Sequence, residues 1–149
     1  MTELGLVISF ISMLATIAIA VTACAQLPAM LKAQKQRATL DACDRYDIEP
    51  MIVYAHRIMR AYYNYNEDVD KNKLHNSVIT ILNYFDSIAL GIDQGLYIKK
   101  IVKAHLSQII IDHIEWAMDE KREHHLARSD MDDSHNYLMK IYDDWKKHP

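Results

Sequence analysis

Positions 4–31 of the chain read LGLVISFISMLATIAIAVTACAQLPAML and contain no charged residue. A helix rises about 1.5 Å per residue and the hydrocarbon core of a bilayer is about 30 Å thick, so about 20 apolar residues cross it. The stretch therefore predicts a transmembrane helix over residues 1–31. A cleaved signal peptide is the alternative, but Glu3 precedes the stretch without any Lys or Arg, and the apolar run is longer than such peptides carry.

The charges on either side of this span predict its orientation. Only Glu3 lies before it, whereas Lys32, Lys35 and Arg37 follow directly. Basic residues favour the cytoplasmic side. We therefore expect a single-pass protein of the cell inner membrane, with its N-terminus outside and its C-terminus in the cytoplasm. The two cysteines of the chain cannot form a disulfide framework, which agrees with the reducing conditions of the cytoplasm.

Small residues recur along one side of the predicted span. At 100° per residue they fall within about 80° of one another. This small-residue seam consists of Gly5, Ser9, Ser12, Thr16, Ala20 and Ala23. Small side chains let helices approach closely in lipid, so the seam predicts a homo-oligomer. The alternative is that small residues are simply tolerated in a span.

Composition predicts an all-α chain. It has three Gly and three Pro in 149 residues, which leaves few turn signals and no Gly-rich phosphate loop. We expect a transmembrane helix at 1–31, a helical stalk at 32–45 and a cytosolic bundle of about four helices at 46–149. All 17 basic residues and all but one of the 20 acidic residues follow the span. That near balance argues against general nucleic-acid binding.

Apolar residues recur at helical spacing in four segments behind the stalk. They are residues 51–65 after Pro50, residues 74–92, residues 96–118, and a last helix capped by Asp132 or Asp133. Gly91 or Gly95 is expected to end the second segment, and Pro28 to kink or interrupt the helix of the span. His105 and His113 fall on the apolar stripe of the third segment and are expected to have hydrogen-bonded core or interface roles.

Basic residues on two of these segments suggest a ligand site. Arg57 and Arg60 lie on the first, and Lys99, Lys100 and Lys103 lie on the third. If adjacent helices bring them together, they form a pocket for an anion such as a nucleotide or oligonucleotide signal. The alternative is that each set is a solvated basic face.

No catalytic motif is present. The chain has no HExxH, CxxC, Walker or Rossmann pattern and no informative Ser/His/Asp spacing, so we expect no enzyme, no catalytic residue and no cofactor. The charged run at 119–133 contains His124 and His125 but lacks a spacing that fixes metal ligands. We expect a solvated loop or a fraying helix end there and no metal; a metal-dependent hydrolase is the least favoured alternative.

The residues Asn83-Tyr84-Phe85-Asp86, followed by an apolar run to Gly95, resemble a short motif of an uncharacterised family of small bacterial membrane proteins. The family usually has Glu where Asp86 stands. The resemblance implies one N-terminal span and a helical cytosolic domain, brings no catalytic residues, and implies a place among antiviral (phage) defence functions. From their i, i+3 spacing, Asn83 and Asp86 are expected to form a buried structural bracket.

Two functions follow from these patterns. In the first, a homo-oligomer acts as a channel-like effector whose spans form or disrupt a membrane pathway when the cytosolic domain senses a signal or partner. In the second, the span is an anchor, and the helical domain recruits a cytosolic protein partner without conduction.

Overall fold

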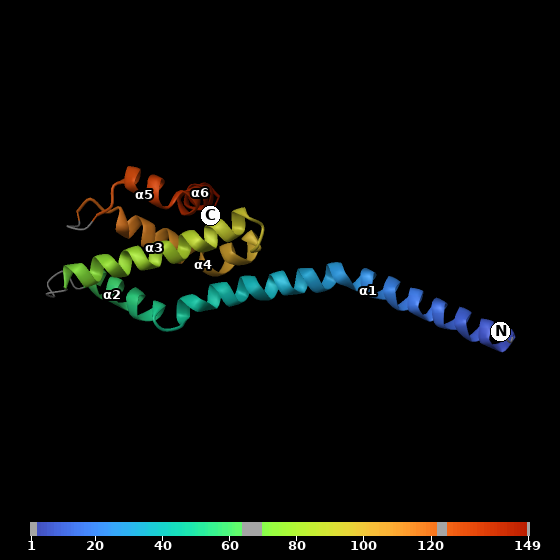
Figure 1. The fold of residues 1–149 in the computed structure, drawn as a ribbon. Coiled ribbons are helices and arrows are strands. Elements are labelled where there is room, and N and C mark those ends of the chain that lie inside the picture. The colour runs from blue at the N-terminus through green and yellow to red at the C-terminus, as the bar shows by residue number, and fades with distance from the viewer. Residues whose placement is uncertain (1–2, 64–69, 122–124, 149) are drawn as a thin grey trace. The chain divides into compact units, whose positions relative to one another are not determined.

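The computed structural model describes residues 3–63, 70–121 and 125–148 (Figure 1). The described residues contain helices and no strand, which confirms the all-α prediction. The elements are α1 (Glu3–Asp44), the 3-10 turn η1 (Arg45–Asp47), α2 (Met51–Tyr63), α3 (Lys71–Asp93), α4 (Lys99–Ala117), α5 (Arg128–Ser134) and α6 (Asn136–Lys147). The chain divides into two units, residues 1–35 and residues 36–149.

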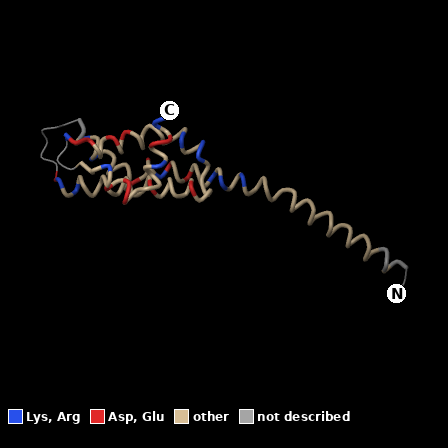
Figure 2. The backbone as a smooth tube through the Cα atoms, turned by 90° about the horizontal axis from the view of Figure 1, so that it is seen from above, with Lys and Arg blue, Asp and Glu red and all other residues tan. Residues whose placement is uncertain are grey.

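Unit 1 is the apolar part of α1. By length and composition α1 is able to cross a membrane, as expected for an N-terminal span. Its large apolar side chains are exposed, for example Ile8 at 60% and Leu31 at 56%. Figure 2 shows no charged position along residues 5–31. Pro28 was expected to kink or interrupt the helix. α1 continues through Pro28, so the interruption is wrong, whereas the kink stays a prediction, because a proline inside a helix removes one backbone hydrogen bond without having to end the helix.

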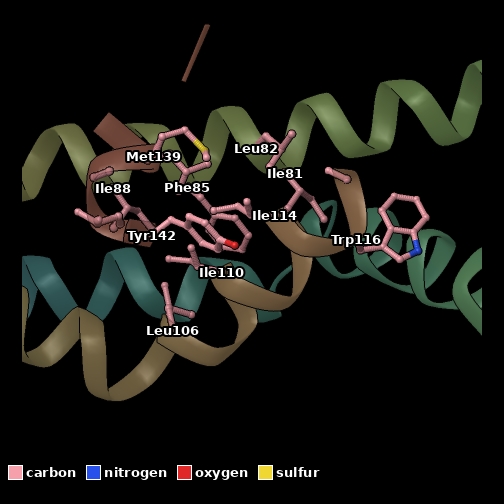
Figure 3. Close-up of a cluster of buried hydrophobic side chains, with 14 of the residues drawn as sticks. Ile81, Leu82, Phe85, Ile88, Leu106, Ile110, Ile114, Trp116, Met139 and Tyr142 are labelled. Carbon is pink, nitrogen blue, oxygen red and sulfur yellow. The ribbon is translucent and has the colours of Figure 1, made fainter. Parts of the chain in front are cut away.

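Unit 2 is organised around α3, on which α2, α4 and α6 pack (Figure 1). The fully buried residues of α3 include Ile81, Leu82 and Phe85, and α4 contributes Ile110 and Ile114. Figure 3 shows these side chains gathered between α3 and α4, with those of α6 beside them. The residues predicted to form the core helix therefore do form it.

The last turns of α1 belong to unit 2. Thr39, Ala42 and Cys43 are buried in it. The hydroxyl of Thr39 accepts a hydrogen bond of 3.0 Å from the backbone N–H of Ile98, the residue before α4. The phenol of Tyr84 donates to the carbonyl of Ala42. The predicted stalk is thus helical, but its end is part of a packed core because small side chains there let α1 approach its neighbours.

The start of α3 differs from the expected one, whereas its end agrees with the expectation for Gly95. The helix begins at Lys71, before Leu74. It starts there because the carboxylate of Asp70 accepts hydrogen bonds from the backbone N–H groups of Asn72 and Lys73, at 3.1 and 3.2 Å. After the helix, Gly95 has φ of 70°, as a residue past a helix end requires. Gly91 lies inside α3, and a Cβ there would come within 2.4 Å of the Tyr97 ring, so its role is close packing.

Two further expectations are wrong. His105 is exposed, because the buried stripe of α4 runs through Val102, Leu106 and Ile110 instead. Asp132 and Asp133 lie within α5, and α6 begins at Asn136, so neither residue caps the last helix. The acidic run forms a helix because Met131 is fully buried there. The expected helix end at Tyr65 lies outside the described residues.

Candidate functional site

A cavity of about 590 Å³ lies between η1, α2 and α4. Both helices pack on α3, and residues of both line the cavity. Its lining consists of Tyr46, Ile58, Met59, Ile109, Asp112, His113, Glu115, Trp116 and Asp119. Cavities of this size typically hold small organic ligands.

One wall of the cavity is aromatic. The Tyr46 ring stacks on Phe85 with 5.7 Å between centroids and meets His113 edge to face at 5.9 Å. His113 Nδ1 lies 2.8 Å from the carbonyl of Ile109, which only accepts, so Nδ1 carries the proton. In the neutral ring Nε2 then accepts from the Tyr46 hydroxyl, 3.4 Å away.

Burial sets the protonation states of this wall. It lowers the pKa of His113, with the Ile109 hydrogen bond and the charge of Asp112 opposing it in part. Burial, with a contribution from the charge of Asp47, raises the pKa of Tyr46 to about 12. The imidazole and the phenol are therefore both neutral near pH 7.

Three carboxylates border the cavity. Asp112 and Glu115 lie three residues apart on one side of α4, and Asp119 follows the end of that helix. Glu115 forms an ion pair of 2.7 Å with Lys146 of α6. The lining includes no Lys or Arg. The cavity is therefore acidic and aromatic.

This cavity was not predicted. The spacing of the three acids beside Trp116 was visible in the sequence, but acids at helical spacing are usually a solvated face. What turns them toward a cavity is α2 on the other side, and periodicity within one helix carries no information about which helix lies opposite.

The structure does not bring the predicted basic pocket together. Arg57 donates to the Ser77 hydroxyl at 2.8 Å, near the start of α3. Lys99 instead pairs with Asp144 at 2.9 Å, at the start of α4. The start of α4 lies beside the end of α3, because Tyr97 N–H bonds to the carbonyl of Gly91. From Ser77 to Gly91 a helix rises about 20 Å, so the two basic sets lie far apart.

The remaining residues of that set do not restore the pocket. Lys103 donates to the carbonyl of His148. Arg60 and Lys100 are exposed. The structure therefore does not form the predicted joint anion site: Arg57 and Arg60 of α2 lie apart from the second group, which is Lys99, Lys100 and Lys103 of α4.

Asn83 and Asp86 both contact the start of α6. The side-chain oxygen of Asn83 lies 3.2 Å from Nε2 of His135, and Asp86 accepts a 2.9 Å hydrogen bond from the backbone N–H of Leu138. The N–H groups of a first helical turn have no partner within their helix. Asp86 thus caps α6 from α3. Asn83 is exposed, so the expected bracket is not a buried one, because the pair sits at the edge of the core.

The small-residue seam lies on the exposed surface of α1. Gly5, Ser9, Ser12, Ala20 and Ala23 are all exposed. The hydroxyl of Thr16 donates to the carbonyl of Ser12 at 2.9 Å, within the same helix. Close packing between copies along this seam stays a prediction.

The charged run after α4 contains His, Asp and Glu side chains, which are potential metal ligands. Among the described residues no group of three His, Cys, Asp or Glu side chains is arranged to hold a metal ion. His124 lies outside the described residues.

Comparison with known families gives one match. The family described as "Domain of unknown function (DUF4760)" matches residues 10–137, which is most of the chain. No curated protein and no solved structure matches. The chain therefore belongs to the DUF4760 family, which confirms the expected membership of a family of unknown function. The bacterial and membrane character that the resemblance also implied stays a prediction.

Proposed function

We propose that this DUF4760 protein is a non-enzymatic, single-span membrane protein that assembles into a homo-oligomer through α1 and whose unit 2 receives a signal or a protein partner in the cytosol. The observation that carries the proposal is the exposed apolar surface of α1. Side chains from Ile8 to Leu31 present it on all sides of the helix.

Such a surface is costly in water and favourable in lipid. Apolar area removed from water contributes about 25 cal/mol per Å², and soluble monomers rarely expose contiguous apolar patches beyond a few hundred Å². A continuous helix also satisfies its own backbone hydrogen bonds, as a membrane span requires. Insertion of residues 8–31 in a bilayer meets both conditions.

The proposed orientation rests on Lys32, Lys35 and Arg37 directly behind the apolar stretch. It places unit 2 in the cytoplasm and the protein in a bacterial inner membrane. A reporter fused after Pro149 is expected to be active in the cytoplasm. A reporter that is active only in the periplasm would contradict the orientation.

In the form we favour, the spans form or disrupt a membrane pathway when unit 2 binds its signal, as in a phage-defence effector. The exposed hydroxyls of Ser9 and Ser12 support this form because they are able to face water in an assembly. The alternative is an anchor that recruits a cytosolic protein without conduction. It is supported by the Thr16 hydroxyl, which is already engaged with Ser12 of its own helix.

One preparation tests both forms. Native membranes carrying the full chain are crosslinked to measure assembly, and leakage of a small dye is measured in the same membranes. Oligomers with leakage support the effector, and oligomers without leakage under any cellular condition support the anchor. A monomer in native membranes would contradict the homo-oligomer in both forms.

A further inference from the structure

We infer that the cavity between α2 and α4 binds a small organic cation with an aromatic or aliphatic body. Binding at this cavity follows from the geometry of unit 2 alone. Its use as the signal site rests on the proposed function.

The charge of the lining selects a cation. Asp112, Glu115 and Asp119 border the cavity, and no Lys or Arg lines it. Lys146 pairs with Glu115 at 2.7 Å, whereas Asp112 accepts a hydrogen bond of 2.7 Å from the neutral amide of Gln108, so the Asp112 carboxylate keeps its negative charge. A carboxylate at the border of a concave site attracts a cation that enters it.

The rings and apolar side chains select the body of the ligand. Tyr46 and Trp116 offer aromatic faces, on which organic cations bind favourably. Ile58, Met59 and Ile109 supply an apolar wall, and the flexible thioether of Met59 is able to adapt to different shapes. Met59 is 48% exposed, so this wall reaches the mouth of the cavity.

The same features disfavour an anionic ligand here. His113 is held neutral near pH 7, because burial lowers its pKa, so it adds no positive charge. The guanidinium of Arg57 on α2 bonds to Ser77 on α3. A nucleotide or oligonucleotide would therefore bring its phosphates against carboxylates without a counter-charge from the lining.

The two tryptophans of the chain make a direct test possible. Trp116 lines the cavity, whereas Trp145 is fully buried in the core and outside the lining. The full chain in nanodiscs, labelled with 5-fluorotryptophan, gives one ¹⁹F resonance for each. The probes are 2-phenylethylamine, 2-phenylethanol and phenylacetate, which share a body and differ in charge.

We expect 2-phenylethylamine to shift the Trp116 resonance and leave Trp145 unchanged. The neutral alcohol is expected to bind about tenfold more weakly, and phenylacetate more weakly still, because each loses attraction to the carboxylates. No shift of Trp116 with the amine, or equal affinity for amine and alcohol, would overturn the inference.

Matched variants separate the cavity from general charge effects. Asp112→Asn with Asp119→Asn removes two lining carboxylates, and Asp93→Asn with Asp133→Asn removes two exposed ones elsewhere. The first pair is expected to weaken amine binding about tenfold and the second to leave it unchanged. Equal weakening by both pairs would overturn the site. Because these experiments measure ligand binding, their outcome does not depend on whether the chain assembles or causes leakage.

Discussion

Asp86 is a residue whose role depends on a helix more than fifty positions away. It accepts the backbone N–H of Leu138 at 2.9 Å, at the third position of α6. Asp86→Ala leaves that donor without its acceptor, so we expect the free energy of unfolding to fall by about 1 kcal/mol, as for loss of an N-cap. Chemical denaturation of residues 36–149 measures it, and exchange of the Leu138 amide is expected to accelerate.

Asp133→Ala is the control for Asp86, because Asp133 is an exposed acid on the neighbouring α5. Its effect on the free energy of unfolding is expected to be near zero. If the two variants are equally stable, the hydrogen bond from Leu138 contributes nothing and the motif has no structural role at α6.

His113 gives a second prediction at this scale, concerning pH. Burial lowers its pKa in the folded state below the ordinary value of 6.5. Between these two pKa values the unfolded chain binds a proton that the folded chain does not, so stability falls as pH falls from about 6.5. Above pH 6.5 the His113 imidazole is neutral in both the folded and the unfolded chain, so it no longer contributes to the pH dependence of stability. His113→Gln is expected to flatten this part of the stability profile.

His105→Gln is the matched control, since His105 is exposed on the same helix. It is expected to keep the parent's slope between pH 6.5 and 5. Denaturant titrations of residues 36–149 at half-unit pH steps make the comparison. An unchanged slope in His113→Gln would mean that the imidazole reaches water in the folded state.

At the scale of elements, the end of α1 is part of the core of unit 2. Thr39, Ala42 and Cys43 are buried, and Thr39 accepts the N–H of Ile98 at 3.0 Å. We therefore expect a fragment of residues 46–149 to be helical by circular dichroism but less stable than residues 36–149 by about 2–4 kcal/mol. Urea denaturation of both fragments measures the difference.

Two variants of the longer fragment locate the effect. Thr39→Val keeps the shape but removes the acceptor, with an expected cost of about 1–3 kcal/mol. Leu40→Ala, at a partly exposed neighbour, is expected to cost much less. Equal stability of the two fragments would show that the last turns of α1 do not contribute to unit 2.

Periodicity predicted the elements better than their junctions. The apolar repeat of α3 from Leu74 onward is local information, and those residues are buried as expected. Asp70 as a cap and the Tyr97 ring against Gly91 depend on single contacts, which a repeat does not encode. Predicting the cavity would have required knowing that α2 lies opposite α4, and the predicted basic pocket was wrong for the same reason. A sequence shows which face of its helix a residue occupies, but not which other helix lies against that face.

At the scale of the whole molecule, the two units differ in the side chains that they expose. Unit 1 exposes apolar side chains, whereas unit 2 buries its own around α3 and has acidic and basic residues interspersed along its helices (Figure 2). That α1 is long and apolar enough to cross a membrane follows from the sequence, because it depends on length and hydrophobicity alone. The proposed assembly would depend on contacts of α1 with other copies, and the small-residue seam is the feature by which it is tested.

The last prediction is that size along the seam controls assembly. Ser12→Leu keeps α1 apolar enough to insert, but adds bulk where neighbouring backbones are expected to meet. Ser12→Ala is expected to be mild, because polar contacts between spans average about 0.6 kcal/mol. Ala18→Leu makes a small-to-large change on the opposite side of the helix, since Ala18 lies about 200° from the centre of the seam. Crosslinking in native membranes is therefore expected to decrease for Ser12→Leu alone, and equal crosslinking of Ser12→Leu and Ala18→Leu would show that the copies do not meet along this side.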